Sequence, residues 1–244
     1  MPFPSFGLAA TLLADIAAFA ANNNFPDLYR SYSWRNDTYV NQFPDILGLE
    51  LQLSGDDKST GITLTDVQAV AAWGAMRNPG RINGAHVSLP ALTLHTAGGV
   101  PQPALAHAPA TPIIHLQNVN GIGPTYQSKV LRFGMPAEYG AIDTRCVRVF
   151  GQGDPAAQQH RWLTLSATQG QHNGRAAGWS IPENQAQWPN GFTIWINILR
   201  RFAQILPANC PHPAPFVDSG MRAAHVWTCA DVEMALFAYA SQFT

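Results

Sequence analysis

The sequence has little charge and almost no lysine. Only 12% of its 244 residues are charged, with 14 basic against 15 acidic side chains and a formal net charge of −1. Twelve of the basic residues are arginine, and the two lysines are Lys58 and Lys129. This balance excludes a broad basic coat for nucleic acid, so any contact with DNA must come from a local cluster of arginines.

Cysteine and long apolar runs are scarce as well. The cysteines, Cys146, Cys210 and Cys229, form no C-x-x-C pair and are too few for a disulfide framework, which predicts a reducing, cytoplasmic location. No apolar run reaches the roughly 20 residues that span a membrane. Asp15 interrupts the apolar stretch 6–21, and no basic residue precedes it, so we interpret this stretch as a buried helix of a soluble protein rather than a signal peptide.

What is present is enough apolar surface for a large core. Hydrophobic residues make up 46% of the chain and aromatic residues 10%, which excludes global disorder. The length is compatible with one large domain or two small ones that share an interface. We favour a single compact domain over residues 1–244 and expect a monomer.

Helical signals dominate the sequence. Thr65-x-x-Gln68 and Ser180-x-x-Glu183 have the form of a capping box, and Thr228 with Asp231 three residues later predicts a last helix that runs to the C-terminus. The stretch 192–206 is amphipathic. Strand-like alternation is limited to 47–53 and 87–95, and the segments 96–111 and 168–190 have loop composition, the second being long enough for a lid or binding loop. The fold class is therefore mainly α with few short strands.

Residues 111–151 carry the clearest functional pattern. Thr111-Pro112 opens a predicted helix, the turn Gly121-Ile122-Gly123 follows, and Pro124 opens a second helix. Two glycines allow a tight turn and let backbone amides approach a phosphate closely. By itself this pattern is equally typical of a plain connection between two helices.

Two ionisable residues follow that turn. Lys129 lies at the border of the apolar stripe of the second helix, and an amine held against apolar surface loses its proton more readily, as a lysine nucleophile requires. Asp143 is predicted to cap the next helix, where backbone amides keep a carboxylate ionised and able to face developing positive charge. The usual roles of such residues are a lysine that extends into water and a simple helix cap.

Polar residues around this pair complete a candidate phosphate-binding patch. Thr125, Ser128 and Arg132 lie on the polar side of the second predicted helix, and Arg145 and Arg148 follow Asp143. In a chain of low charge density, these arginines form the most concentrated basic patch, which is suited to gripping a few phosphates.

The pattern resembles a known family. The run Gly121-Ile-Gly-Pro-Thr-Tyr-Gln-Ser-Lys129-Val-Leu-Arg-Phe, followed by Pro136-x-x-Tyr139-x-x-x-Asp143, is similar to the prokaryotic family with an 8-oxoguanine DNA glycosylase fold, itself similar to the helix-hairpin-helix DNA glycosylase superfamily. Ala230-Asp-Val-Glu-Met-Ala-Leu-Phe237 also resembles the end of those proteins. The resemblance covers about forty residues and implies a helix-hairpin-helix fold with its catalytic core at about 111–151.

The resemblance also implies roles for individual residues. Lys129 would be the Schiff-base nucleophile, Asp143 the carboxylate that assists it, and Gly121, Ile122 and Gly123 the hairpin that holds the lesion strand. Lys129 lies six residues after Gly123, about one helical turn further than in the best-known members. The candidates for an aromatic base pocket are Trp73, Phe150, Trp179 and Trp188.

The function implied is that of a DNA N-glycosylase. It would flip out and excise a modified base from double-stranded DNA, either an oxidised purine in repair or a hypermodified phage base in defence. Attack by Lys129 would permit strand cleavage by β-elimination, whereas water oriented by Asp143 would give a monofunctional enzyme. Neither route needs a cofactor or a metal.

Two other functions compete with this one. A non-catalytic helix-hairpin-helix protein would use the same turn only to bind DNA. A metal hydrolase is suggested by eight histidines, among them His86, His95, His107 and His115, but their spacing matches no ligand pattern, so we expect no metal site.

Overall fold

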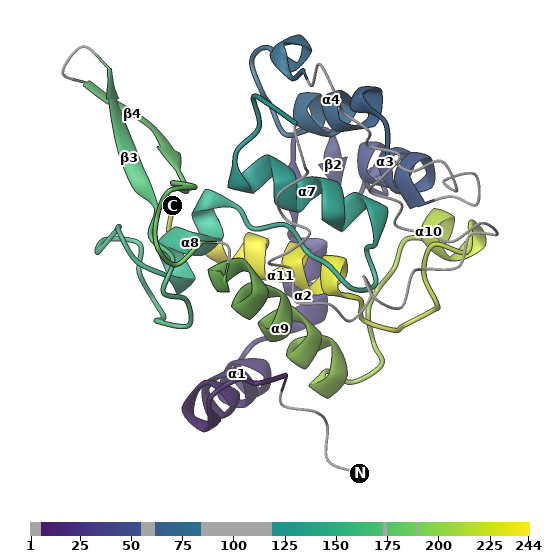
Figure 1. Cartoon of the computed structure of the whole chain (residues 1–244). Coiled ribbons are helices and arrows are strands. Elements are labelled where there is room, and N and C mark those ends of the chain that lie inside the picture. Colours follow the sequence, from purple (N-terminus) through teal and green to yellow (C-terminus); the bar gives the residue numbers. More distant parts are fainter. Residues whose placement is uncertain (1–5, 55–61, 84–118, 173–174, 189) are drawn as a thin grey trace.

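The computed structural model describes residues 6–54, 62–83, 119–172, 175–188 and 190–244, and these ranges are mainly helical (Figure 1). The helices are α1 (Ala10–Asn22), α2 (Phe25–Arg30), α3 (Pro44–Ser54), α4 (Leu64–Trp73), the 3-10 helix η2 (Pro79–Arg81), α7 (Pro124–Gly134), α8 (Thr144–Phe150), α9 (Asn190–Ile205), α10 (Ala214–Asp218) and α11 (Cys229–Ala240). The strands are β1 (Ser33–Trp34), β2 (Asp37–Thr38), β3 (Thr168–His172) and β4 (Arg175–Ser180). The mainly helical fold with few short strands is confirmed for the described residues.

The strands form two separate antiparallel pairs, β1 with β2 and β3 with β4. The β3–β4 hairpin projects from the helical body in Figure 1. Part of the predicted loop 168–190 is therefore a β-hairpin. The capping box predicted at Ser180 is wrong, because Ser180 ends β4 opposite Thr168 and the carboxylate of Glu183 accepts a hydrogen bond from Gln127 instead.

Helix α11 lies at the centre of the packing and contacts α2, α8 and α9. Its predicted cap is confirmed: Thr228 Oγ1 accepts from the Asp231 amide, and Asp231 Oδ2 accepts from the Thr228 amide. Nearly every residue of α11 is buried, including the charged Asp231 and Glu233. A helix that is buried on all sides must find partners for its charges inside the protein.

Two element boundaries differ from the sequence prediction. Helix α4 is capped by Thr63 rather than Thr65, because Asp66 at the third helical position reaches back to the Thr63 amide. The strand predicted over 47–53 is part of α3, whose buried residues Ile46, Leu49, Glu50 and Leu53 recur at helical spacing. Three further predictions lie outside the described residues: the strand over 87–95, the loop 96–111 and the helix that begins at Thr111.

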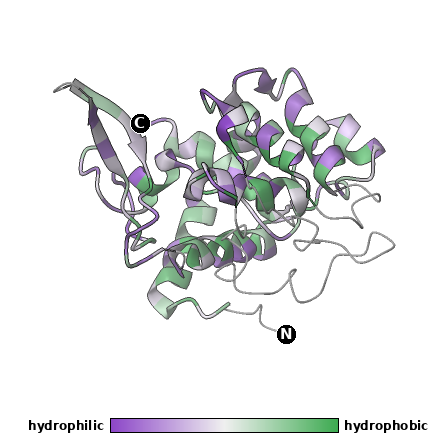
Figure 2. Cartoon of the chain, turned by 45° about the horizontal axis from the view of Figure 1, so that its top comes forward, coloured by the Kyte–Doolittle hydropathy of each residue, from purple (hydrophilic) through white to green (hydrophobic). Residues whose placement is uncertain are grey.

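The remaining predictions concern single elements. In α1 only Ile16 and Phe19 are buried, so the expected buried helix covers the core with one face. The three cysteines are free and buried. Among the helices in the described ranges, none is both long and apolar enough to cross a lipid bilayer. Figure 2 shows hydrophobic and hydrophilic residues alternating along the helices of the body, as expected of helices with one buried face.

Candidate functional site

The predicted glycine turn is present and leads directly into α7. Gly121 has φ +90°, a backbone angle that favours glycine, and a Cβ there would lie 3.3 Å from the Arg81 carbonyl oxygen, which is a tight contact. Gly123 is the N-cap of α7, and Pro124 is its first residue. The helix predicted before this turn lies outside the described residues, so the structure shows the turn and the second helix of the predicted motif.

The structure brings Lys129 and Asp143 together. Lys129 Nζ lies 3.6 Å from Asp143 Oδ2, and the two side chains are 6% and 14% exposed. Asp143 caps α8 as predicted and accepts a hydrogen bond from the Arg145 amide at 3.1 Å. The amine and the carboxylate thus come from two consecutive described helices and face each other at their junction.

Three aromatic rings surround the lysine amine. The centroids of Trp34, Trp73 and Tyr126 lie 5.3 to 5.5 Å from Lys129 Nζ, within the range of cation–π contact. The rings come from the β1–β2 hairpin, the end of α4 and the start of α7. These cation–π contacts stabilise the position of the amine.

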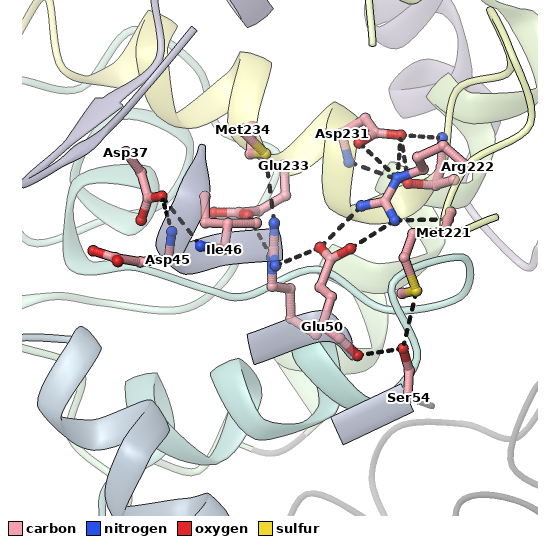
Figure 3. Close-up of polar contacts among 12 residues, drawn as sticks. Asp37, Asp45, Ile46, Glu50, Ser54, Met221, Arg222, Asp231, Glu233 and Met234 are labelled. Carbon is pink, nitrogen blue, oxygen red and sulfur yellow. Dashed lines mark hydrogen bonds and ion pairs between the residues drawn. The ribbon is translucent and has the colours of Figure 1, made fainter. Parts of the chain in front are cut away.

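Hydrogen bonds hold these rings in place. Trp34 Nε1 donates to the carbonyl oxygen of Trp73 at 3.0 Å, and Trp73 Nε1 donates to Asp37 Oδ2 at 2.7 Å. The other oxygen of Asp37 accepts from the amides of Asp45 and Ile46 at the start of α3 (Figure 3). Burial raises the pKa of Asp37, although these hydrogen bonds oppose the shift. The β1–β2 hairpin therefore links α3 and α4 to the rings around the amine.

Lys129 and Asp143 both line a cavity of about 300 Å³. Trp34, Tyr126 and Trp179 supply aromatic surface to this cavity, and Trp179 belongs to β4. Further residues from four segments of the chain also line the cavity. Thr125, Thr144 and Ser180 bring hydroxyl groups, and Gly74 and Gly123 bring backbone. An amine, a carboxylate and flat aromatic walls in one open cavity are suited to binding a flat ring and reacting with an electrophilic carbon beside it.

Two of the predicted phosphate contacts on α7 are wrong. Arg132 is 1% exposed and donates to Glu50 Oε1 at 2.7 Å, so it cannot reach a phosphate. Ser128 is fully buried, where its Oγ donates to the Thr125 carbonyl oxygen and accepts from the Ile142 amide. The polar side of α7 faces inward because neighbouring elements supply partners for it, which a helical periodicity cannot reveal.

The other two arginines lie nearer the surface. Arg145 is half-buried, with its guanidinium 5.5 Å from the ring of Trp34 and 5.0 Å from that of Phe237. Arg148 donates to Asp154 Oδ2 at 2.7 Å and lies over the Trp179 ring at 4.5 Å. Both residues contact rings that line or adjoin the cavity, but they do not form one patch with the buried Arg132.

Of the four residues predicted to form the base pocket, two lie at the cavity or the lysine amine and two do not. Trp179 lines the cavity, and Trp73 contacts the lysine amine. Phe150 is fully buried and stacks on Trp162 at 4.7 Å, so its assignment to the pocket is wrong. The assignment of Trp188 to the pocket is also wrong, because this residue is buried against Phe192 and does not line the cavity. The sequence prediction missed Trp34 and Tyr126 as walls of the cavity.

A buried network of charges lies behind the cavity. Glu50 accepts hydrogen bonds from both Arg132 and Arg222, and Arg222 also donates to Asp231 (Figure 3). Glu233 Oε2 lies 3.8 Å from Arg132 Nε. The sequence prediction placed Asp231 only as a helix cap, and it missed Glu50, Glu233 and Arg222. A usable signal was Glu50 within the apolar run of α3, on the same helical face as Ile46 and Leu53.

One cluster in the described residues has metal-ligating side chains, namely Cys210, His212 and Asp231. The oxygens of Asp231 already accept hydrogen bonds from His212, Thr228 and Arg222. Burial raises the pKa of Cys210, which keeps it a neutral thiol. With a saturated carboxylate, a neutral thiol and a guanidinium beside them, these residues fit a structural cluster rather than a cation site.

Comparison with known proteins yields no relative: no family model, no curated protein and no solved structure matches the chain. The function therefore has to be inferred from the chemistry that the cavity brings together. Its distinguishing features are the close amine–carboxylate pair and the aromatic walls beside it.

Proposed function

We propose that this protein is a DNA N-glycosylase that flips a modified base out of duplex DNA and excises it. The contact that carries the proposal is the 3.6 Å approach of Lys129 Nζ to Asp143 Oδ2 inside an open, aromatic-lined cavity. This pair lines a space of about 300 Å³, whereas the Arg222–Glu50 pair is fully buried. The motif from Gly121 to Asp143 resembles glycosylases in the same residues.

The reaction we propose starts at the C1′ atom of the flipped nucleotide. The N-glycosidic bond breaks, and the base leaves with the bonding electron pair and takes up a proton. Asp143 faces the positive charge that develops on the sugar. The lone pair of Lys129 forms the new bond to C1′, and opening of the sugar ring gives an imine that permits β-elimination of the 3′ phosphate.

The walls of the cavity suit an extruded base. A base taken out of the stack loses its stacking partners, and Trp34 and Trp179 line the cavity with aromatic side chains. The Gly121–Gly123 turn adjoins the cavity through Gly123, and its backbone amides can approach the phosphates of that strand. We propose an oxidised purine or a hypermodified phage base as the substrate, in repair or in defence.

Borohydride trapping on duplex DNA tests the lysine chemistry. The expected result is a covalent adduct on a DNA with an abasic site, because borohydride reduces the imine to a stable amine. Lys129→Ala is expected to abolish the adduct, and Lys58→Arg is the matched control because Lys58 is the other lysine of the sequence. An adduct that persists in Lys129→Ala would exclude Lys129 as the nucleophile.

Base release distinguishes an enzyme from a DNA-binding module. A panel of duplexes with oxidised purines or phage-type modified bases would be incubated with the protein, and free base would be measured. Asp143→Asn is expected to lower release by about 10²-fold or more while DNA binding is retained. Binding with no base released from any duplex, together with no trapped adduct, would favour the non-catalytic alternative.

A further inference from the structure

Three exposed arginines lie on the segments that form the α4 side of the cavity. They are Arg35 in the β1–β2 turn, Arg77 after α4 and Arg81 at the end of η2. No ion pair among the described residues includes any of them. Arg132 and Arg148, by contrast, are paired with Glu50 and Asp154. The charges on the α4 side are therefore not neutralised by a carboxylate of the described residues.

The stretch of chain that contains Arg77 and Arg81 has no acidic residue. Between Asp66 and Glu138 the sequence contains neither aspartate nor glutamate, although the whole chain has 15 acidic residues. The described part of this stretch forms the rest of α4, then η2, the glycine turn and α7. Helix α4 contacts both η2 and α7, and it lies beside α7 in Figure 1. One side of the cavity is thus built from basic and neutral residues, in a chain whose net charge is −1.

Arg81 lies against the glycine turn. Its carbonyl oxygen is 3.3 Å from the position that a Cβ of Gly121 would take. Two backbone hydrogen bonds join Asn83 to Asn120 directly before the turn, at 2.8 and 3.3 Å. The end of η2 and the turn are therefore adjoining segments, and a DNA strand held by the turn passes next to η2.

Arg77 and Arg35 flank the cavity at the end of α4. Arg77 directly follows Met76, which lines the cavity. Arg35 Nη1 donates to the Ala72 carbonyl oxygen at 2.7 Å, so its guanidinium is fixed beside the last turn of α4. Burial raises the pKa of Tyr126, a wall of the cavity, and the charge of Arg35 acts against this shift. The positive charge of Arg35 therefore acts on the cavity wall.

Resting on the proposed function, we propose that Arg35, Arg77 and Arg81 bind the phosphodiester backbone of the DNA strand whose base enters the cavity. A guanidinium can bind a phosphate through two parallel hydrogen bonds, and these three have no ion pair with a described acid to give up. They come from three segments, so they follow a strand along the cavity rather than hold a single phosphate. This surface lies on the other side of the cavity from α8, where the sequence placed the basic patch.

The position of these arginines favours DNA over another anionic partner. They adjoin the glycine turn and the cavity, which the proposed function assigns to a phosphate and to a flipped base. The backbone of that same strand is the anion that such a base brings with it. An acidic protein surface would need no cavity beside it.

Binding of undamaged duplex DNA at several salt concentrations tests this surface. An undamaged duplex suffices, because phosphate contacts do not depend on the identity of a base. Arg77→Gln and Arg81→Gln are each expected to reduce the slope of log affinity against log salt by about 0.9, and replacement of all three arginines by about 2.7. Fluorescence anisotropy measures the affinities. Arg35→Gln also removes a bond to α4, so the two single variants carry the test if the triple variant does not fold.

Two controls separate charge from structure. Arg77→Lys and Arg81→Lys keep the positive charge and should retain the wild-type slope, because the slope counts neutralised phosphates. Arg161→Gln is the matched control, since Arg161 is also exposed and outside the ion pairs of the described residues, but lines a separate cavity beside α1. Its slope should equal that of the wild type.

The outcomes for this surface and for the enzyme are distinguishable. Wild-type slopes in both Arg77→Gln and Arg81→Gln, or no binding of wild-type protein to duplex DNA at low salt, would overturn the proposed surface. Reduced slopes support it even if no duplex releases a base, and that result would reject the glycosylase alone. Base release with unchanged slopes would reject the surface alone.

Discussion

Two pairs of opposite charges in this protein differ sharply in how tightly they are held. Arg222 and Glu50 approach to 2.7 Å, and both side chains are fully buried. Lys129 and Asp143 are 3.6 Å apart, with Asp143 14% exposed and both lining the cavity. The first pair is fully buried, whereas the second borders an open cavity.

The tightly held charges connect helices of the fold. Arg222 joins α3 to α11 by binding Glu50 and Asp231, and Arg132 adds α7. Such a network fixes the helices that position Lys129 and Glu233. The Lys129–Asp143 pair is held less closely than the Arg222–Glu50 pair, and it borders the cavity. Mutation of the two pairs should therefore change the free energy of unfolding by different amounts.

The largest expected effect is on stability. Arg222→Met leaves Glu50 and Asp231 buried with one cation fewer, which should lower the free energy of unfolding by about 3 to 5 kcal/mol. Lys129→Met should cost less than Arg222→Met, because Asp143 borders the cavity and keeps its capping bond. Urea denaturation of both variants measures their free energies of unfolding. Equal losses in the two variants would show that the two ion pairs contribute equally to stability.

The next effect is a pH dependence that Glu233 adds to stability. Its pKa is about 7 in the folded protein against an ordinary value of 4.5, so the folded state binds the proton more tightly. The stabilisation is complete below about pH 4.5 and is lost as pH rises towards 7, a change of about 2 to 3 kcal/mol. Unfolding of Glu233→Gln should lack this loss over the same interval, and parallel curves for the two proteins would contradict the assignment.

A smaller effect is expected at the aromatic wall. Trp179 lines the cavity from β4, and stacking on one base contributes about 1 to 3 kcal/mol in proteins that hold unpaired bases. Trp179→Ala should weaken binding of duplex DNA with a modified base by that amount, while leaving affinity for undamaged duplex nearly unchanged. Fluorescence anisotropy with both duplexes measures it. Trp188→Ala is the contrasting variant, since this buried ring does not line the cavity.

The sequence indicated the Lys129–Asp143 pair because its signals are local. The turn at Gly121, the helix that begins at Pro124 and the cap at Asp143 all lie within one short stretch, where backbone rules decide the structure. The sequence analysis missed Trp34 and gave Arg132 the wrong role, because the position of each depends on residues far away in the sequence. Arg132 is buried because Glu50, 82 positions away, supplies its partner, and Trp34 is placed by contact with α4. Long-range packing leaves no periodicity to read.

The smallest expected effect concerns the half-buried Arg145, which lies between the tight network and the open pair. Its guanidinium lies over the rings of Trp34 and Phe237 at 5.5 and 5.0 Å, near the cavity and without a carboxylate partner among the described residues. If it contacts one phosphate, Arg145→Gln should reduce the slope of log affinity against log salt by about 0.9 and leave base preference unaltered. Arg148→Gln should change the slope less, because Asp154 already binds that guanidinium. Titrations at several salt concentrations would compare the two, and an unchanged slope in Arg145→Gln would place the DNA backbone away from α8.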